Sequence, residues 1–477
     1  MAQASEYRGS HEGLAMDRFD FVVIGTGAAG EASAFAALER GRSVAVVERE
    51  LVGGSCSFWA CIPSKALAHA ASEHRRGDYS WARASARRDY MINREGRDGP
   101  DDSGHVGRLE GAGATIVRGV ARIAGRGVVE VRAAAASGVS PKGAARRLEA
   151  GTIVVATGSQ PKMPPVEGLA DADPWTNREA TSTRDLPRSV VVLGGGAMGV
   201  EMSSIFARFG VDTALVHGHD RLIERDHPRI SEAAARILRG DGVDLRLGVR
   251  TVRVGSRTGK GGVHVVELSD GTSVRGERIV VALGRSFGLD GLGLESVGLD
   301  PGSLRPDGRL RIADGIYLVG DPAGPEMFTH VSHYQGTLAV RMALGEHVTP
   351  DYRAIPRAVF LEPEIASVGL SVEGAAEAGL DAFEKVVDFA TTTRGYELEA
   401  EFGHLAIVVD RTSETLVGAS VVAPDASAAI HETVLAIQAR IPVAQLATMI
   451  HGFPTTSRAF DGLYAEALKE LRTTVAA

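Results

Sequence analysis

Short apolar runs rich in Val and Ile recur along the first two thirds of the chain, and several precede a stretch with the composition of a helix. The runs DFVVI (20–24), SVAVV (43–47), SVVVL (189–193) and TALV (213–216) are β-branched and short, which predicts buried strands. The segments EASAFAALERG and VEMSSIFARFG that come between them have the length of helices. Strands that alternate with helices predict parallel sheets covered by helices, an α/β fold.

The pattern changes after residue 350. The segments AVFLEPEIASVGL, HLAIVVD and TLVGASVVA are strand-like, and AIHETVLAIQARI and AFDGLYAEALKEL have the apolar spacing of amphipathic helices. This region has no glycine-rich phosphate loop. We therefore predict an α+β domain at residues 351–477 that packs against a second copy of the chain, giving a homodimer.

Composition narrows the functional classes. Hydrophobic content of 44% and charged content of 23% are typical of a soluble enzyme. The balance of Lys+Arg 52 against Asp+Glu 60 gives no basic field, so neither nucleic acid nor an anionic membrane is an expected partner. The chain shows neither a signal-peptide pattern at its start nor an apolar run long enough to span a membrane. We expect a cytoplasmic protein without a resident metal ion.

Two glycine motifs stand at strand-to-helix junctions. In DFVVIGTGAAG the glycines Gly25, Gly27 and Gly30 follow the first strand, and Glu48 ends the next strand about 20 residues later. This context turns a weak G-x-G-x-x-G pattern into a dinucleotide fingerprint. The glycines let the backbone approach a pyrophosphate at a helix N-terminus, and the acid binds ribose hydroxyls.

The second motif, SVVVLGGGAMG, repeats the arrangement with Gly194, Gly196 and Gly199. Here His217 stands where the first copy has Glu48. A carboxylate at this position favours an unphosphorylated ribose and arginines favour a 2′-phosphate, so the choice between NADH and NADPH stays open. His217 as a surface residue that merely ends a strand is an equal alternative.

Three further strands end in Gly beside a polar residue. They are IVVATGS (153–159), RIVVALGR (278–285) and GIYLVGDPAG (315–324). Such strand ends are where doubly wound sheets place ligands. We expect Asp321 to bond a hydroxyl of a bound dinucleotide, with a simple turn role as the alternative.

These units predict the domain plan. Residues 1–17 form a polar tail and the first strand begins near Asp20. Residues 18–159 and 286–350 form one dinucleotide-binding domain, residues 160–285 a second, and residues 351–477 the dimerisation domain. The Arg-rich and Gly-rich segment 84–113 is expected to complete the helix after the cysteines and then form a long surface loop.

Cys56 and Cys61 are the chain's two cysteines and lie in GGSCSFWACIPSK (53–65). A pair in a reducing compartment is more often catalytic than structural. Five residues of regular helix rise about 7.5 Å, more than the roughly 4.4 to 6.8 Å between Cα atoms of a disulfide. A bridge therefore requires an irregular turn. Two buried cysteines without a bridge are the alternative, which the neighbouring nucleotide motifs make less favourable.

With these residues in place, the chain resembles the pyridine nucleotide-disulphide oxidoreductases, in their class I branch similar to dihydrolipoamide dehydrogenase and mercuric reductase. The resemblance runs from about Phe19 to Leu471 and is most specific in GGSCSFWACIPSK. It implies an FAD domain interrupted by an NAD(P) domain, a C-terminal dimer interface, and electron flow from nicotinamide through flavin to the disulfide.

The resemblance also implies roles for individual residues. Cys61 would face the flavin and Cys56 would exchange with substrate, while Lys65 and Glu201 would lie beside the reactive flavin nitrogen. An ordinary surface role for Lys65 is the alternative. The implied FAD-binding residues are Gly25, Gly27, Gly30, Glu48, Gly54, Ser55, Lys65, Gly119, Thr157, Gly158, Ser159, Gly320 and Asp321. The implied NAD(P)-binding residues are Gly194, Gly196, Gly199, Glu201, His217 and Gly284.

The nucleotide positions depart from the family pattern. Family members that use NADPH carry arginines at the positions of Gly218 and Glu224, and NADH users carry an acid at His217. This chain fits neither pattern. Gly199 in the third glycine position favours NADH slightly.

The C-terminal motif departs further. Family members that act on dithiols end in His-Pro-Thr-x-x-Glu, whereas this chain has MIHGFPTTSRAF (449–460). Phe453 stands in place of the histidine base and Arg458 in place of the glutamate. Loss of a positioned base typically costs about 10² to 10⁴ in rate, so efficient turnover of lipoamide is not expected. His451 is a weak candidate for a substitute base.

These observations predict an FAD-dependent NAD(P)H oxidoreductase that passes electrons through Cys56 and Cys61 to a non-standard small-molecule acceptor. That acceptor would be a specialised disulfide, a quinone, a metal ion or a metabolite. Two alternatives remain: a transhydrogenase or diaphorase that uses the flavin alone, and a nucleotide-sensing flavoprotein that binds a partner.

Overall fold

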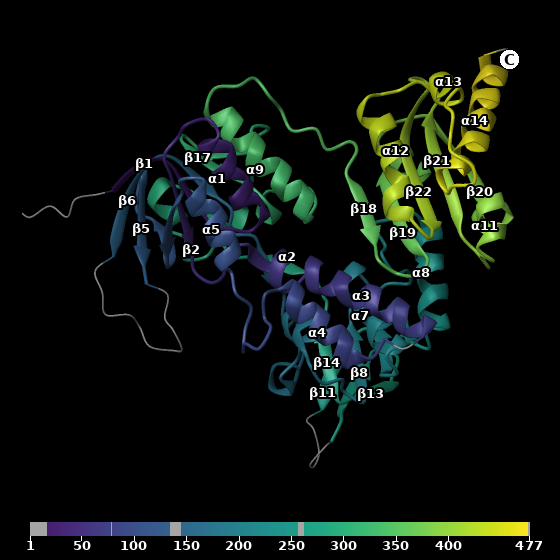
Figure 1. The fold of residues 1–477 in the computed structure, drawn as a ribbon, viewed down its shortest axis with the longest axis horizontal. Coiled ribbons are helices and arrows are strands. Elements are labelled where there is room, and N and C mark those ends of the chain that lie inside the picture. Colours follow the sequence, from purple (N-terminus) through teal and green to yellow (C-terminus); the bar gives the residue numbers. More distant parts are fainter. Residues whose placement is uncertain (1–16, 78, 134–144, 256–261, 476–477) are drawn as a thin grey trace, which may run out of the picture. The chain divides into compact units, whose positions relative to one another are not determined.

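The computed structural model describes residues 17–77, 79–133, 145–255 and 262–475 (Figure 1). Its contacts form two compact units. The first comprises Met1–Gly54, Asp102–Ser159 and Phe287–Pro350, and the second Ser55–Asp101, Gln160–Ser286 and Asp351–Ala477. The predicted polar tail lies almost entirely outside the described residues. The first strand begins at Asp17, slightly earlier than predicted.

The first unit is built on a mainly parallel sheet. Its central strands, in spatial order, are β17 (Ile316–Leu318), β6 (Arg146–Val155), β1 (Asp17–Ile24), β2 (Val44–Glu48) and β3 (Thr115–Arg118). The short strand β16 (Arg311–Ala313) joins one edge in antiparallel fashion. The Val and Ile residues of β1, β2 and β6 are nearly all fully buried, as expected for parallel strands that are covered on both faces.

Different elements cover the two faces of this sheet. The helices α1 (Ala28–Leu38), α5 (Ser103–Gly111) and α9 (Thr329–Ala343) contribute to one core, and α1 lies along α9 (Figure 1). The antiparallel pair β4 (Val120–Ile123) and β5 (Val128–Arg132) contributes to the other core. This layering leaves the carboxyl ends of β1, β6 and β17 at one edge, where the predicted nucleotide residues follow.

The second unit contains a second parallel sheet. Its order is β10 (Asp244–Arg246), β9 (Asp212–Val216), β8 (Ser189–Leu193) and β14 (Arg278–Val281). The helices that accompany it in the chain are α2 (Gly54–Phe58), α3 (Cys61–Arg76), α4 (Trp81–Met91), α6 (Asn177–Ser182), α7 (Ala197–Arg208) and α8 (Pro228–Gly240). A three-stranded antiparallel sheet follows: β11 (Thr251–Gly255), β12 (His264–Leu268) and β13 (Ser273–Gly276). The cysteine helix α3 packs on α4 and α7.

The C-terminal part of the second unit is a five-stranded antiparallel sheet with helices. The strand order is β18 (Pro356–Val359), β19 (Glu364–Gly369), β22 (Thr415–Ala423), β21 (His404–Asp410) and β20 (Ala382–Asp388). The helices are α10 (Val372–Glu377), α11 (Thr393–Glu397), α12 (Ala426–Gln438), α13 (Val443–Leu446) and α14 (Phe460–Val475). Apolar residues of α12 and α14 share one core with this sheet. The short strands β7 (Ser159–Pro161) and β15 (Arg285–Phe287) form a separate pair.

The predicted fold class is confirmed: two Rossmann-like α/β regions and a C-terminal α+β domain. The prediction for residues 84–113 was wrong. Instead of one long surface loop, this segment holds most of α4 and all of α5, joined by residues 92–102. Composition gave the wrong prediction in part because an arginine of α4, Arg88, is fully buried, whereas arginines are mostly exposed.

Candidate functional site

The first glycine loop packs its helix closely against its strand. Gly25 has φ of +94°, and a Cβ on Gly30 would overlap the carbonyl oxygen of Gly25. The middle glycine differs, because a Cβ on Gly27 would meet no heavy atom within 4 Å. The open space at Gly27, at the N-terminus of α1, therefore suits the close approach of a pyrophosphate.

Glu48 fixes this loop through hydrogen bonds. Its carboxylate accepts from the Thr26 N–H at 2.9 Å and the Thr26 hydroxyl at 2.7 Å, and from the Glu50 N–H at 2.8 Å. The Gly53 N–H donates to the Thr26 carbonyl at 3.0 Å, and a Cβ on Gly54 would lie 2.6 Å from Gly27 Cα. The start of the cysteine segment thus lies directly against the loop.

Polar groups gather at the ends of β6 and β17. The Ser159 hydroxyl donates to the Asp321 carboxylate, and Gln335 of α9 accepts from the Gly320 N–H at 2.8 Å. The Thr157 hydroxyl is buried and has no hydrogen-bond partner in the described part of the chain. A buried hydroxyl without a partner and the open space at Gly27 both fit a bound dinucleotide. Gln335 was not predicted from the sequence, because a buried glutamine in a helix carries no motif.

The second glycine loop has the same geometry. Gly194 has φ of +115°, a Cβ on Gly199 would overlap the Gly194 carbonyl oxygen, and Gly196 has open space beside it. His217 accepts from the Gly195 N–H through Nδ1 at 3.1 Å. Burial lowers the pKa of His217 below its usual value, which keeps the ring neutral. His217 is therefore part of the loop, and the alternative of a mere surface residue is disfavoured.

The two cysteines lie on different helices. Cys56 is on α2 and Cys61 begins α3, and Ala60 between them has φ of −132° and ψ of −101°. The helix is therefore broken where a bridge requires an irregular turn, and the two cysteines lie near disulfide distance. Both side chains are half-buried and so reachable, unlike cysteines of a dry core.

Residues of α6 hold this break in place. The Trp59 carbonyl accepts from Asn177 Nδ2 at 2.7 Å and from the Thr181 hydroxyl at 3.3 Å. Phe58 is buried and packs edge-on to Trp59, whose ring lies under the guanidinium of Arg178. The aromatic residues between the cysteines therefore serve packing. No sequence motif marked Asn177, Thr181 or Arg178, which are more than 100 residues away along the chain.

One turn after Cys61, Lys65 forms an ion pair with Glu201 of α7. Lys65 Nζ lies 2.8 Å and 3.0 Å from the two carboxylate oxygens. The Glu201 side chain is 5% exposed, and it also accepts from the Phe360 N–H at 3.0 Å. The ammonium lies 4.9 Å from the centroid of the Phe360 ring. Lys65 is thus a positioned cation, and Phe360 is a supporting residue that the sequence did not reveal.

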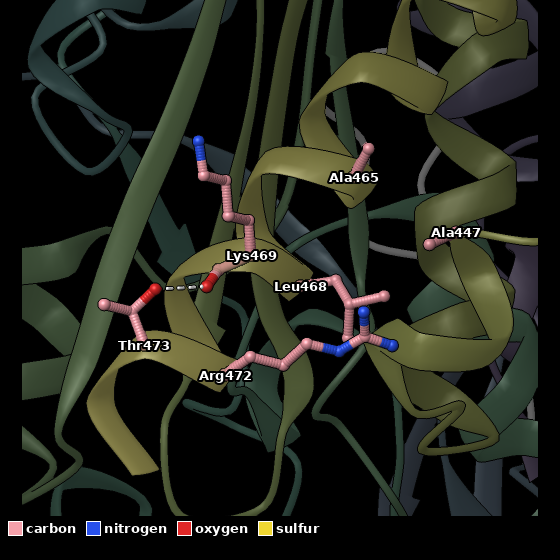
Figure 2. Close-up of a pocket in the computed structure, with 6 residues that line it drawn as sticks. All are labelled: Ala447, Ala465, Leu468, Lys469, Arg472 and Thr473. Atoms are coloured by element: carbon pink, nitrogen blue, oxygen red, sulfur yellow. Dashed lines mark hydrogen bonds between the residues drawn. The ribbon is translucent and has the colours of Figure 1, made fainter. Parts of the chain in front are cut away.

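The hollows of the second unit differ in their relation to the predicted site residues. A cavity of about 570 Å³ runs along α3, and its lining includes Lys65, His69 and Phe360. A shallow hollow between α13 and α14 has a lining of Ala447, Ala465, Leu468, Lys469, Arg472 and Thr473 (Figure 2). The first hollow gives access to a predicted site residue, and the second contains none of them.

The C-terminal loop presents no ready proton acceptor. Phe453 is 69% exposed, and Arg458 is paired with Asp461. His451 is buried, with Nε2 3.0 Å from a Glu432 oxygen and Nδ1 against Asp461. Both of its nitrogens face carboxylates, so the sequence-based suggestion of His451 as a substitute base is disfavoured.

The described ranges hold neither a membrane span nor a metal cluster. No helix in them is long and apolar enough to cross a membrane. The same residues contain no group of three or more His, Cys, Asp or Glu side chains that could hold a metal ion.

Paired nucleotide loops, a reachable cysteine pair and a positioned lysine define a flavoprotein disulfide reductase that uses a nicotinamide cofactor. Comparison with known sequences identifies the family: residues 19–336 match the pyridine nucleotide-disulphide oxidoreductases, and residues 355–464 match the dimerisation domain of the same family. The chain therefore belongs to the pyridine nucleotide-disulphide oxidoreductase family.

Relatives and solved structures agree with this assignment. The chain is 32% identical to the dihydrolipoyl dehydrogenase of Chlorobaculum tepidum, over 94% of this chain and 97% of that one. It is 33% identical to the mercuric reductase of Streptomyces lividans, over 92% and 94%. Among solved structures, LpdA from Mycobacterium tuberculosis has a TM-score of 0.83 at 27% identity, over 94% of this chain and 99% of that one. The HOCl-induced flavoprotein disulfide reductase RclA from Escherichia coli has a TM-score of 0.81 at 26% identity, over 94% and 99%.

Proposed function

We propose that this enzyme oxidises NAD(P)H and passes the electrons through FAD and the Cys56/Cys61 pair to a non-standard small-molecule acceptor. The observation that carries the proposal is the placement of the pair at the break between α2 and α3, one helical turn before the Lys65–Glu201 ion pair. A reducible pair and a buried, positioned cation on one helix suit electron delivery to sulfur.

The two glycine loops assign the cofactors. Gly25, Gly27, Gly30 and Glu48 would hold FAD, together with Gly54, Ser55, Lys65, Gly119, Thr157, Gly158, Ser159, Gly320 and Asp321. The residues that would hold NAD(P)H are Gly194, Gly196, Gly199, Glu201, His217 and Gly284. On sequence grounds Gly199 favours NADH, while the surroundings of His217 favour the phosphorylated cofactor.

FAD, when bound, relays two electrons between the nicotinamide and sulfur. Lys65 would hold a positive charge where negative charge accumulates, and the buried Glu201 carboxylate keeps that ammonium charged and aimed. Two electrons and two protons convert the Cys56–Cys61 disulfide into two thiols. Cys61 would face the flavin, and Cys56 would transfer the reducing equivalents to the acceptor.

The acceptor is proposed to differ from lipoamide. Phe453 cannot accept a proton, Arg458 is paired with Asp461, and His451 is held between two carboxylates. A dithiol reaction requires a base beside the exchanging thiol. A specialised disulfide, a quinone, a metal ion or another metabolite that takes electrons without such a base remains compatible.

The absence of a base in the C-terminal loop also favours one competing function, in which the flavin alone reduces the acceptor. Anaerobic titration with NADPH or NADH, with counting of free thiols before and after, tests the thiol route. We expect two additional thiols per chain, and Cys61→Ser to abolish acceptor reduction nearly completely. Full acceptor reduction by Cys61→Ser would establish the flavin-only function, and a purified chain without FAD would end both.

We further propose that the enzyme is a homodimer that acts in the cytoplasm. The family match at residues 355–464 is to a dimerisation domain. Leu435, Ile450 and Phe453 of this domain are large apolar residues that are 62%, 100% and 69% exposed. A second copy of the chain would cover them, and light scattering tests the mass.

A further inference from the structure

In each nucleotide-binding unit, the residue at the end of the second strand accepts a hydrogen bond from the glycine loop. This residue is Glu48 in the first unit and His217 in the second. In the first loop the N–H after the first glycine, that of Thr26, donates to Glu48 at 2.9 Å. In the second loop the equivalent N–H, that of Gly195, donates to His217 Nδ1 at 3.1 Å. His217 therefore occupies the structural place of the ribose-binding acid, although it cannot offer the same chemistry.

The difference lies in the number of lone pairs that remain for a ligand. A carboxylate has about four acceptor positions, and Glu48 uses three of them within the protein. A neutral imidazole has one acceptor, and Gly195 uses it. The other nitrogen, Nε2, is buried against the backbone of Arg221. His217 thus has no acceptor left for the hydroxyl groups of an unphosphorylated ribose.

The side chain of Arg250 lies beside Gly218, the residue that follows His217. Gly218 follows His217, and a Cβ on it would lie 3.2 Å from Arg250 Cγ and 3.6 Å from Arg250 Nε. Arg250 immediately precedes β11, and its loop is bonded to the His217 loop by Val249 N–H to His217 O at 3.1 Å. Within the described residues, no carboxylate forms an ion pair with the exposed Arg250 guanidinium.

Other charged side chains around this loop make contacts of their own. His219 pairs with Glu224 at 3.1 Å, and Arg221 donates to the Glu224 carbonyl at 3.4 Å. A Cβ on Gly248 would lie 2.7 Å from Asp220 Oδ1, so that carboxylate faces the turn at Gly248. Arg221 therefore also keeps its charge, but Arg250 is the cation whose side chain packs against Gly218, directly beside His217.

We infer that Arg250, beside a ribose position that His217 has stripped of acceptors, binds the 2′-phosphate of the adenosine ribose and makes NADP(H) the preferred nicotinamide cofactor. The inference rests on the proposed function and specifies its electron donor. A guanidinium binds phosphate through charge-assisted, often bidentate hydrogen bonds. The cation comes from a different loop than the Gly218 and Glu224 positions considered from the sequence.

The sequence-based preference for NADH from Gly199 carries little weight in this geometry. A Cβ on Gly199 would overlap the Gly194 carbonyl, and a Cβ on Gly30 would overlap the Gly25 carbonyl in the same way. Both loops therefore need glycine at this position for helix packing. Helix packing therefore explains Gly199, which does not indicate whether the bound ribose is phosphorylated.

The test is calorimetric titration of the purified full chain with 5′-AMP and with adenosine 2′,5′-bisphosphate, which differ only in the 2′-phosphate. We expect wild-type enzyme to bind the bisphosphate roughly tenfold or more tightly than 5′-AMP, given a charged hydrogen bond to phosphate. Arg250→Ala should lose this preference with unchanged 5′-AMP affinity, and Arg250→Lys should keep part of it. His217→Glu should reverse the preference.

Arg253→Ala is the matched control, because Arg253 lies on the neighbouring strand β11 and is paired with Glu267 at 2.7 Å. It should leave both affinities unchanged. Equal affinities of wild-type enzyme for the two ligands, or an undiminished preference in Arg250→Ala, would overturn the inference. FAD content and thiol counts on the same samples test the proposed function separately. A chain that lacked FAD or gained no thiols could still be titrated with the two nucleotides.

Discussion

Thr181 connects the buried Arg88 to the break between the two cysteines. Its carbonyl oxygen accepts a hydrogen bond from the Arg88 guanidinium, while its hydroxyl donates to the Trp59 carbonyl at 3.3 Å. Arg88 also donates to the Thr183 carbonyl at 3.1 Å and pairs with Asp89 at 2.9 Å. An arginine on α4 thereby supports, through α6, the turn on which the proposed redox pair depends.

Replacing Arg88 by Met should destabilise the protein by about 2 to 4 kcal/mol, because it leaves buried carbonyls without donors and removes a buried ion pair. Burial lowers the pKa of Arg88, while the ion pair with Asp89 favours its charged form. Urea unfolding followed by fluorescence gives the free energy of unfolding. Arg87→Ala, at an exposed site on the same helix, is the control and should change it by less than about 0.5 kcal/mol. Equal stability of both variants would contradict this account.

Replacing Glu201 by Gln should slow flavin reduction by NAD(P)H about tenfold to a hundredfold, because the Lys65 ammonium loses the carboxylate that keeps it charged and aimed. Gln retains the shape and a carbonyl acceptor for the Phe360 N–H, so the fold should persist. Stopped-flow measurement of flavin absorbance gives the rate constant. Glu73→Gln, which removes a partner of Arg76 farther along α3, is the control. An unchanged rate constant in Glu201→Gln would argue against a role for this ion pair.

The sequence predicted the features that residues close together in the chain determine, such as the two nucleotide loops. Strand, glycines and helix of each nucleotide loop lie within about 30 residues, so their spacing alone identifies them. The residues that support the site come from distant segments. Phe360 reaches Glu201 across 159 positions, and Asn177 reaches Trp59 across 118. No local periodicity records such contacts, which depend on how the elements pack.

Composition is misleading where a polar residue is buried with its partners. The Arg-rich segment around Arg88 predicted a surface loop, yet backbone carbonyls bind Nη1 of the Arg88 guanidinium and Asp89 binds its Nε inside the protein. Gly199 meets a similar backbone requirement, because a Cβ at this position would overlap the Gly194 carbonyl oxygen. In both cases the deciding partner was a backbone carbonyl oxygen, which a sequence pattern does not show.

Restoring a base to the C-terminal loop should require two substitutions. In Phe453→His the new imidazole would still have Arg458, not a carboxylate, at the position that orients the base. We expect the double variant Phe453→His/Arg458→Glu to raise lipoamide reduction about a hundredfold, the lower range for a positioned base, and Phe453→His alone to raise it less. Tyr396→His, at an exposed position of α11 outside this loop, should have no effect. Equal rates for the double variant and wild type would show that the loop does not approach the thiols.

The stability of the protein should fall in mild acid because of His404. This residue begins β21 and is buried, with Nε2 3.0 Å from the Ser420 hydroxyl. Burial, together with the nearby His227 and Arg229, lowers the pKa of His404 from 6.5 to about 4. Between these two values the unfolded chain binds a proton that the folded chain does not. The contribution of neutral His404 to the free energy of unfolding is therefore fully present above pH 6.5. It is lost as the pH falls toward 4, by up to about 3 kcal/mol.

Measuring the free energy of unfolding from pH 4.5 to 7.5 tests this linkage. In His404→Gln the uncharged amide can still bond Ser420, and the part of the slope that His404 causes should disappear. His69→Gln removes an exposed histidine and should leave the slope of wild type unchanged. If His404→Gln and wild type lose stability in parallel as the pH falls, the acid sensitivity comes from other groups, and the buried imidazole is not the cause.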